Sequence, residues 1–280
     1  MKCYHHDDID GRSAAAIVAE HENNYNPKDY IEMNYDRTIP LDILSKNEKV
    51  YIVDYSFSIE TVDSLIALLK ITKNVEWIDH HESSFKLIKK FPQYDKIKGL
   101  RKNNISGAAL AYMYLNNVDK LEDCPRYIQL VSDFDCWIYK FKDETINFKF
   151  GLEALDYSAL SSTWMLMDDK TTNEIIENGK VIYQYVLKIN LEYITKYGFE
   201  CTFEDLKCLA VNKRDNGMIF GDRINDYDIV STFVFKGDIV SYSIFTVNDD
   251  VDCSKLAEKY GGGGHKKASG FSSDKLILRR

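Results

Sequence analysis

Aspartate and histidine residues return at intervals along the first half of the chain, in positions where they could share metal ions. The motif His6-Asp7-Asp8-Ile9-Asp10-Gly11 comes first, followed by Asp54, by Asp79-His80-His81 and by Asp133. Most of these residues directly follow short apolar runs typical of β-strands, and the carboxyl ends of parallel strands meet in one crevice of an open α/β sheet. Carboxylates and imidazoles gathered there need cations to neutralise their charge. The pattern therefore predicts a two-metal site, and two metals held by Asp and His usually indicate phosphoryl chemistry.

The order of these motifs resembles the DHH phosphoesterase superfamily, which includes RecJ-like and nanoRNase-like enzymes. His-x-Asp-x-Asp-Gly, a lone Asp, Asp-His-His and a second lone Asp follow one another as they do in that family. Near the other end, residues 261–270 (GGGGHKKASG) are similar to the glycine-rich signature of the DHH-associated C-terminal domain. The resemblance covers both halves of the chain. It implies a metal-dependent phosphoesterase of the phosphodiesterase or exonuclease type.

Length and composition are those of a folded protein with room for two domains. The 280 residues are 45% hydrophobic and 13% aromatic, and the 6 cysteines form no Cys-x-x-Cys pair, so we expect reduced thiols. No apolar run approaches the roughly 20 residues that span a bilayer, and the N-terminus lacks a signal-peptide pattern. These features predict a cytoplasmic protein that does not bind membranes.

The charge balance limits the class of substrate. The net charge is −8, from 36 basic and 44 acidic residues, and neither half of the chain has the strongly basic character that long nucleic acid favours. A small anionic substrate at two divalent ions remains compatible with this balance. We therefore expect a short single-stranded oligonucleotide or a small nucleotide as substrate; a homodimer is left open.

Strand and helix patterns alternate in the first half of the chain. This alternation predicts an α/β domain over residues 1–160, with a mostly parallel sheet flanked by helices. The predicted strands cover residues 2–5, 50–53 and 75–78, and the predicted helices lie around residues 14–19, 59–69, 106–115 and 126–131.

The second half of the chain changes character. A long helical pattern over residues 161–198 predicts a connector between two domains. Residues 199–280 predict a smaller α+β domain with an antiparallel or mixed sheet, in which Lys236-Gly237-Asp238 forms a hairpin turn. Its predicted elements are strands over residues 208–211, 229–235 and 239–247 and a helix over residues 254–259.

The resemblance also implies how the metal ligands are shared. Asp54 would bridge the ions, since one carboxylate can hold two ions roughly 3.5–4 Å apart. Asp135 is an alternative to Asp133 as the last ligand of the second ion. The oxygen-rich set suits two Mn²⁺ ions, with Mg²⁺ as an alternative. The implied ligands are His6, Asp8 and Asp54 for one ion, and Asp10, Asp54, His80 and Asp133 for the other.

His81 and Asp79 are assigned to catalysis. Neighbouring side chains of an extended segment point to opposite sides, so we expect His80 and His81 to point in different directions. By resemblance, His81 would face the substrate phosphate, and Asp79 would accept a hydrogen bond from an imidazole. The same alternation would place the side chains of residues 6, 8 and 10 on one side of an extended segment, before Gly11 allows a turn into a helix.

The glycine-rich end is interpreted as a substrate-binding loop. Backbone N–H groups of residues Gly262, Gly263 and Gly264 could approach an anion closely, with His265 beside them. Many members of the family carry an arginine in the strand before the last helix, where this chain has Phe245. An aromatic ring can stack on a base but cannot clamp a phosphate. Arg214 and Arg223 are candidate replacements.

Together these features favour a Mn²⁺-dependent phosphodiesterase that hydrolyses short oligonucleotides to mononucleotides by two-metal activation of water. The first alternative is a hydrolase of a small nucleotide, either a 3′-phosphoadenosine 5′-phosphate phosphatase or a cyclic (di)nucleotide phosphodiesterase. The second is a non-catalytic binding scaffold with the same fold.

Overall fold

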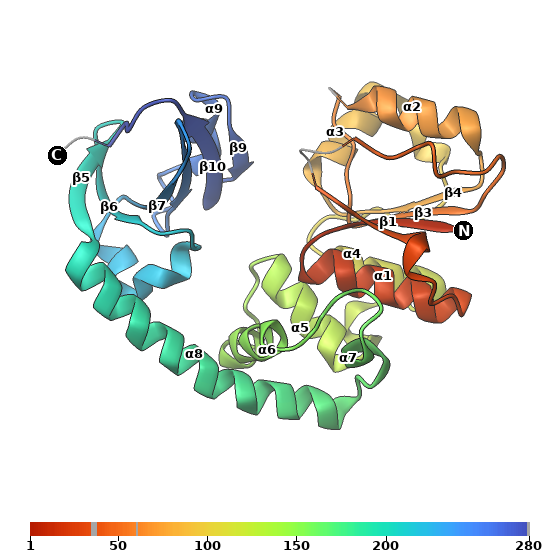
Figure 1. Cartoon of the computed structure of the whole chain (residues 1–280), viewed down its shortest axis with the longest axis horizontal. Helices are drawn as coiled ribbons and strands as arrows, with labels where there is room; N and C mark the ends of the chain where they lie inside the picture. Colours follow the sequence, from red (N-terminus) through yellow and green to blue (C-terminus); the bar gives the residue numbers. More distant parts are fainter. Residues whose placement is uncertain (35–37, 60, 279–280) are drawn as a thin grey trace. The chain divides into compact units, whose positions relative to one another are not determined.

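A computed structural model describes residues 1–34, 38–59 and 61–278, and the packing divides the chain into two units (Figure 1). The first unit is Met1–Tyr183 and the second is Gln184–Arg280. The helix α8, Asp169–Tyr197, crosses the division, which falls inside the segment predicted as the connector. Each unit has its own sheet and its own hydrophobic core, so the two are described separately.

The first unit is built on a sheet of parallel strands, which confirms the predicted α/β class. The strand order is β2-β1-β3-β4, and neighbouring strands pair in parallel. All four residues of β3 are buried, as expected for a central strand that is covered on both faces. The strands are β1 Lys2–His6, β2 Tyr30–Met33, β3 Val50–Val53 and β4 Val75–Ile78.

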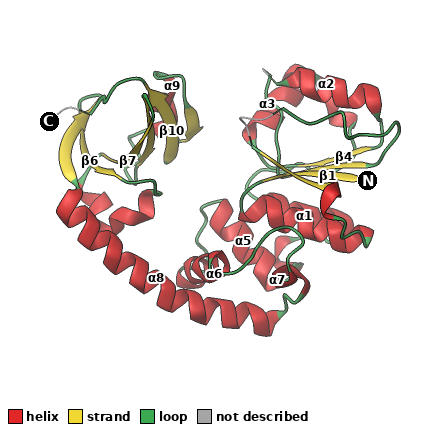
Figure 2. Cartoon of the chain, in the orientation of Figure 1, coloured by secondary structure: helices red, strands yellow, loops and turns green. Residues whose placement is uncertain are grey.

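Helices cover both faces of this sheet (Figure 2). Side chains of β3 alternate between two cores: Tyr51 and Val53 pack with α1 and α4 on one face, and Val50 and Ile52 pack with α2 and α3 on the other. The helices of this unit are α1 Ile9–Glu22, α2 Val62–Ile71, α3 Glu82–Lys90, α4 Gly107–Asn116, α5 Arg126–Asp135, α6 Asp143–Glu153, α7 Ser162–Met165 and the first part of α8. Short 3₁₀ segments occur at Pro27–Asp29, Pro92–Lys96 and Leu121–Asp123.

Several elements did not stand out in the sequence. The strand β2 is an edge strand with only one fully buried residue, so its apolar pattern is weak. The helices α3 and α6 are short and contain many polar residues, so they have too few apolar residues to show a helical pattern. The long pattern over residues 161–198 is two helices rather than one, because Asp168 accepts a hydrogen bond from the backbone N–H of Thr171 at the start of α8.

The second unit contains a mixed sheet, as predicted. Its strand order is β5-β6-β7-β8-β10-β9, and β6 and β7 pair in parallel, whereas the other neighbours are antiparallel. The predicted turn between β7 and β8 is present, with Gly237 at a φ of 62°. The elements are β5 Phe199–Phe203, β6 Leu206–Asn212, β7 Ile229–Lys236, β8 Ile239–Phe245, α9 Cys253–Glu258, β9 Gly263–His265, β10 Ala268–Ser273 and a 3₁₀ segment at Gly217–Asp226.

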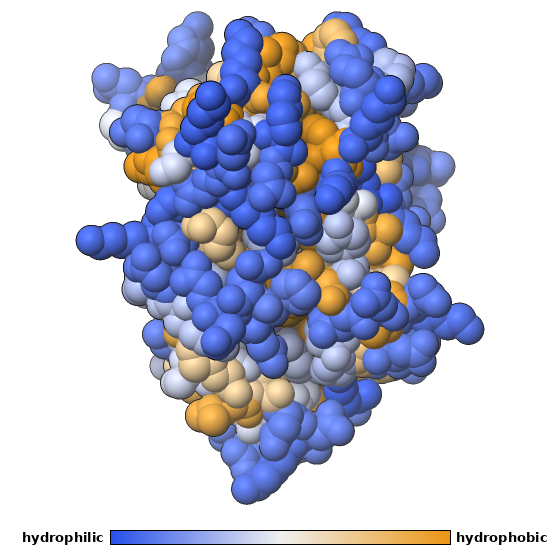
Figure 3. All heavy atoms as spheres, turned by 90° about the vertical axis from the view of Figure 1, so that its right-hand side faces the viewer, coloured by the Kyte–Doolittle hydropathy of each residue, from blue (hydrophilic) through white to orange (hydrophobic). Residues whose placement is uncertain are grey.

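Hydrophilic side chains predominate on the face drawn in Figure 3, and hydrophobic ones form small groups between them. Among the residues that the structure describes, no helix combines the length and the apolar character needed to cross a membrane. All six cysteines lie in the described part of the chain and none forms a disulfide; five of them are buried.

Glycines let the helices α6 and α8 cross at close range. A methyl group on Gly179 would lie 1.7 Å from the carbonyl oxygen of Asn147 and 2.6 Å from the backbone nitrogen of Gly151. A methyl group on Gly151 would in turn lie 2.1 Å from the carbonyl oxygen of Ile175. Because backbone atoms cannot move aside easily, this crossing tolerates only hydrogen at these two positions.

We expect Gly179→Ala to lower the free energy of unfolding of the first unit by about 1–3 kcal/mol. This is the opposite of the usual effect in a helix, where alanine is favoured over glycine by about 1 kcal/mol. The exposed neighbour Asn178, changed to Ala, is the matched control and should alter stability by less than about 0.5 kcal/mol. Urea unfolding followed by intrinsic fluorescence measures this unit selectively, because the three tryptophans are Trp77, Trp137 and Trp164. A midpoint for Gly179→Ala at or above that of the wild type would contradict the close crossing.

Candidate metal centre

The predicted site residues of the first unit meet at the carboxyl ends of its strands. His6 is the last residue of β1, Asp54 follows β3, and Asp79 follows β4. The chain passes from β1 to β2 on one side, whereas β3 lies on the other side of β1, so the crevice between β1 and β3 is a topological switch point. Open α/β sheets bind their ligands in such crevices.

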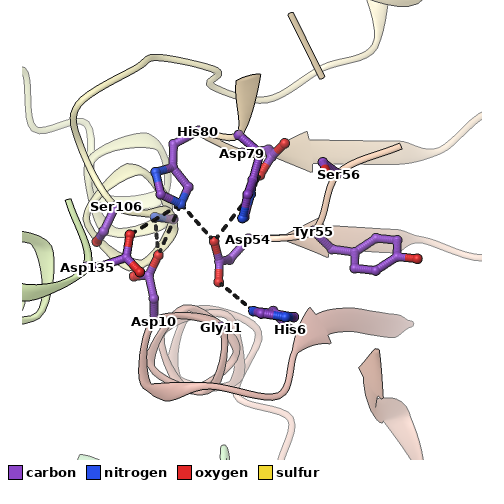
Figure 4. A network of polar contacts seen from close by, with 12 residues as sticks. His6, Asp10, Gly11, Asp54, Tyr55, Ser56, Asp79, His80, Ser106 and Asp135 are labelled. Atoms are coloured by element: carbon purple, nitrogen blue, oxygen red, sulfur yellow. Dashed lines mark hydrogen bonds and ion pairs between the residues drawn. The ribbon is translucent and has the colours of Figure 1, made fainter. Parts of the chain in front are cut away.

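Asp54 lies at the centre of the cluster (Figure 4). Its side chain is buried, and neither carboxylate oxygen has a hydrogen-bond partner among the described residues. Oδ1 lies 3.2 Å from Nε2 of His80 and 3.8 Å from Nδ1 of His81, and Oδ2 lies 3.9 Å from Nδ1 of His6; these are ion-pair distances without hydrogen-bond geometry. Burial, together with the nearby carboxylate of Asp10, raises the pKa of Asp54 well above its usual range. An ionised carboxylate that is buried without a hydrogen-bond donor raises the free energy of the folded protein unless a cation pairs with it. The site therefore fits a metal ion.

The backbone at Asp54 has a conformation that side-chain-bearing residues seldom adopt. Its φ is 51°, in the left-handed region. A methyl group on Gly107 would lie 2.4 Å from Cβ of Asp54, so the glycine allows the first turn of α4 to approach this residue. Strained backbone of this kind is concentrated at functional sites.

Residues 6 to 10 reach the cluster through a turn rather than through an extended segment, so the predicted alternation is wrong. β1 ends at His6, and Asp8 caps the N-terminus of α1 by accepting a hydrogen bond from the backbone N–H of Gly11 at 2.9 Å. The other carboxylate oxygen of Asp8 lies 2.7 Å from Nδ1 of His6. A methyl group on Gly11 would lie 2.4 Å from the carbonyl oxygen of His6, so the helix can start directly over the end of the strand.

Asp10 ties the amino ends of two helices together. Its carboxylate oxygens accept hydrogen bonds from the backbone N–H groups of Gly107 and Ala108, at 2.6 and 2.8 Å, in the first turn of α4. The same carboxylate lies 3.8 Å from Nε2 of His80. The positive end of the α4 dipole therefore holds a negative charge beside the cluster.

The two adjacent histidines point toward the same oxygen, contrary to the expectation of opposite directions. β4 ends at Ile78 and α3 begins at Glu82, so both histidines lie in the short link between the strand and the helix, where His81 has a φ of −70° and a ψ of 139°. The ring centroids of His80 and His81 lie 4.5 Å apart, and both rings approach Oδ1 of Asp54.

Asp79 has the imidazole partner that was expected for it. One oxygen of this fully buried carboxylate lies 2.7 Å from Nδ1 of His81, and the other accepts a hydrogen bond from the hydroxyl of Ser84. Burial alone would raise the pKa of Asp79, but the hydrogen bond with His81 outweighs it and lowers the pKa. Asp79 therefore stays ionised and orients the His81 ring.

The structure brings Asp135, and not Asp133, into the cluster. The two residues are separated by about 200° around α5, so they point to opposite sides of this helix. The carboxylate of Asp133 accepts hydrogen bonds from two backbone N–H groups of the turn after α5 and from the hydroxyl of Thr145. Oδ2 of Asp135 lies 3.4 Å from Nε2 of His80. By position, Asp135 is therefore the better candidate for the ligand role expected of Asp133, and the assignment of a metal ligand here stays a prediction.

Among the residues that the structure describes, three groups of side chains could each hold a metal ion, because one ligand atom from each member lies within 4.8 Å of the others. These groups are His6, Asp8 and Asp54; Asp54, His80 and His81; and His80, Asp135 and Cys136. The first group equals the set that the resemblance implies for one ion. Sequence reasoning missed Cys136, although it directly follows Asp135. Burial raises the pKa of Cys136 to about 12 in the absence of a metal ion.

The glycine-rich run of the second unit is largely a strand rather than a loop. Residues Gly263–His265 form β9, which pairs with β10. A methyl group on Gly262 would lie 2.2 Å from the carbonyl oxygen of Gly270, so this glycine is needed for packing, whereas a methyl group on Gly263 would meet nothing within 4 Å. Gly264 has a φ of 143°. The side chain of His265 lies outside the described residues, so its predicted contact with substrate stays a prediction.

Phe245 does not offer the stacking surface expected of it. Its side chain is 8% exposed and packs in a core of the second unit, against Gly217. The ring fills space that would otherwise lie empty between the strands and the 3₁₀ segment. Of the candidate replacements, Arg214 is exposed and Arg223 is half-buried.

No protein-family model matches the chain. The chain is 24% identical over 238 residues to the uncharacterized protein R106 of Acanthamoeba polyphaga mimivirus, and 23% identical over 249 residues to the oligoribonuclease NrnB of Bacillus subtilis (strain 168). Each match covers 81% of this chain but only 53% and 60%, respectively, of the two relatives. The chain thus spans little more than half the length of these curated relatives.

Solved structures share the fold of the whole chain. The pGpG-specific phosphodiesterase PggH of Vibrio cholerae matches with a TM-score of 0.56 and 14% identity, over 97% of this chain and 92% of that one. The DHH domain of a member of the S1p family of ribosomal proteins matches with a TM-score of 0.60 and 13% identity, over 96% and 81%. RecJ of Thermus thermophilus in complex with Mn²⁺ matches with a TM-score of 0.51 and 12% identity, over 96% and 49%. The chain therefore shares the fold of these solved structures, one of which is described as a DHH domain.

Proposed function

We propose that this chain is a metal-dependent phosphodiesterase that hydrolyses short oligonucleotides to mononucleotides. The observation that carries the proposal is the buried carboxylate of Asp54. Its oxygens have no hydrogen-bond partner in the described part of the chain, and they face His6 on one side and His80 on the other. A carboxylate placed between two groups of ligand atoms can hold two ions together.

The ligand chemistry favours Mn²⁺ over Zn²⁺, because the set that we assign to the ions contains four carboxylates, those of Asp8, Asp10, Asp54 and Asp135, and two imidazoles, those of His6 and His80. Two such ions, when bound, would lower the pKa of a water molecule for attack on phosphorus and neutralise the phosphate charge. We assign His6, Asp8 and Asp54 to one ion and Asp10, Asp54, His80 and Asp135 to the other.

His81 is proposed to act on the substrate. Burial lowers the pKa of His81, but the hydrogen bond with Asp79 outweighs this effect and raises the pKa. The hydrogen bond to Asp79 also holds the ring in one orientation, with its Nδ1 atom occupied by Asp79. A donor in that position stabilises negative charge on a phosphate oxygen as it develops.

The choice of substrate draws on the relatives and on the charge of the chain. NrnB is named an oligoribonuclease and PggH a pGpG-specific phosphodiesterase, and both names refer to short nucleotides. An acidic chain with a net charge of −8 suits such substrates better than long nucleic acid.

A substrate panel with Mn²⁺ tests this proposal. RNA of two to five nucleotides should be converted to mononucleotides, and 3′-phosphoadenosine 5′-phosphate and cyclic dinucleotides should react more slowly. Preferential turnover of either of the last two would favour the small-nucleotide alternative. Absence of hydrolysis in every reaction, with bound Mn²⁺, would favour the binding scaffold.

We expect Asp54→Asn to abolish the stabilisation of the first unit by Mn²⁺. In the wild type, Mn²⁺ at 100 times its Kd should raise the free energy of unfolding by about 2.7 kcal/mol. In the variant, both ions lose a ligand, so the melting temperature should no longer respond to Mn²⁺, while the circular dichroism spectrum stays that of a folded protein. The exposed Asp63, changed to Asn, is the control and should respond like the wild type. Retention of two ions by Asp54→Asn, measured by metal analysis, would exclude the bridging role.

Replacement of His80 and of His81 by alanine should have different effects on kcat and on metal content. His81→Ala should lower kcat by about 10²- to 10⁴-fold and leave the metal content unchanged, because one transition-state donor is lost. His80→Ala should lose metal, since this ring lies in two of the three ligand groups. Steady-state kinetics and metal analysis of both variants make the comparison. Loss of metal from His81→Ala alone would reverse the assignment.

A further inference from the structure

A second feature of the first unit is a cavity of about 240 Å³ that opens beside the candidate metal centre. Its lining includes carboxylates assigned to the ions, those of Asp8, Asp10 and Asp135. Its apolar wall contains the aromatic residues Phe134 and Tyr157, together with Ile9 and Val131, and Asp7 and Glu153 complete the lining. None of the three histidines of the centre lines the cavity.

The apolar wall indicates an organic ligand. Metal ions and their water molecules need oxygen and nitrogen atoms and gain nothing from aromatic rings, whereas a nucleobase stacks on such rings. Pockets that enclose a whole drug-sized ligand measure about 300–1,000 Å³. A cavity below that range suits a single ring system attached to a phosphate that lies outside, at the ions.

Neighbouring cations hold both aromatic rings in place. The guanidinium carbon of Arg12 lies 4.9 Å from the centre of the Tyr157 ring, and Nζ of Lys149 lies 5.7 Å from the centre of the Phe134 ring. Arg12 is itself fixed by Glu32, at 2.8 Å. The rings are thus part of an ordered surface before any ligand binds.

Glu153 gives this cavity a chemical preference. Its side chain is 38% exposed, and Oε2 lies 2.7 Å from Nζ of Lys149, the lysine that also approaches Phe134. When ions neutralise the carboxylates of the metal centre, Glu153 retains an acceptor of N–H groups next to the aromatic wall. It repels phosphate, so the part of a nucleotide that it can bind is the base.

We propose that this cavity, lined by Phe134, Tyr157 and Glu153, binds the base of the nucleotide whose phosphate is hydrolysed, and that it prefers guanine. Guanine presents two adjacent N–H donors on its Watson–Crick edge, which one carboxylate can accept together. Uracil presents a single N–H between two carbonyl groups, which a carboxylate repels. This inference rests on the proposed function and adds a substrate preference that resides in the catalytic unit itself.

The test compares pGpG with pUpU as substrates in the presence of Mn²⁺. The wild type should have the higher kcat/KM with pGpG, and Glu153→Gln should lower that value by about 5- to 150-fold, the scale of one bidentate contact to a base, with a smaller effect on pUpU. Phe134→Leu should raise KM for both substrates, because stacking does not depend on the base. Matched controls are Glu177→Gln and Tyr185→Leu, two exposed residues of α8 outside the cavity; both should retain the wild-type ratio.

The outcomes separate this inference from the proposed function. Hydrolysis of both dinucleotides at equal kcat/KM, or an unchanged ratio in Glu153→Gln, would overturn the guanine pocket and leave the phosphodiesterase intact. Hydrolysis of neither would overturn the proposed function, and equilibrium dialysis with GMP and UMP then tests the pocket directly. Tighter binding of GMP that Glu153→Gln removes would support the pocket, and equal binding would overturn it. Fluorescence-monitored unfolding of each variant shows that the first unit is folded.

Discussion

One buried negative charge organises the first unit. The carboxylate of Asp54 is withdrawn from water at the end of a central strand, where it has no hydrogen-bond donor among the described residues. Such a charge costs free energy in the protein interior and is tolerated when a cation offsets it. The surrounding imidazoles and carboxylates are arranged so that ions can occupy that place from two sides. The stability of the metal-free protein is therefore linked to the function proposed for the site.

Asp54 and Asp79 lie at the same edge of the sheet, but the pKa values of their carboxylates are shifted in opposite directions. Asp54 has no hydrogen-bond donor within the described ranges of the chain, and its pKa is raised. Asp79 is hydrogen-bonded to His81 and to Ser84, and its pKa is lowered. Equal burial thus leads to different roles, because the partners differ. Asp79 is suited to orient a neighbouring ring, and Asp54 is suited to bind cations.

Close backbone approach is the second requirement of this site. Gly11 lets α1 start directly over the end of β1, and Gly107 lets α4 start beside Asp54. Because neither glycine has a side chain, its backbone N–H can reach a carboxylate at the site. The N–H of Gly11 donates to Asp8, and the N–H of Gly107 donates to Asp10. The carboxylates are therefore positioned by helix ends, which are among the more rigid parts of a fold.

The sequence by itself determined the α/β class of the first unit and most of its strands and helices, though not β2, α3 or α6. It also determined that the second unit has an antiparallel or mixed sheet, and it identified most of the acidic cluster. These features depend on local periodicity and on motifs that follow strands, which are readable without a structure. Tertiary structure decided between Asp133 and Asp135, because that choice depends on how α5 is rotated and on which backbone groups the following turn presents. It also turned both His80 and His81 toward Asp54 and buried Phe245, since the direction of a side chain is set by packing among segments distant in sequence.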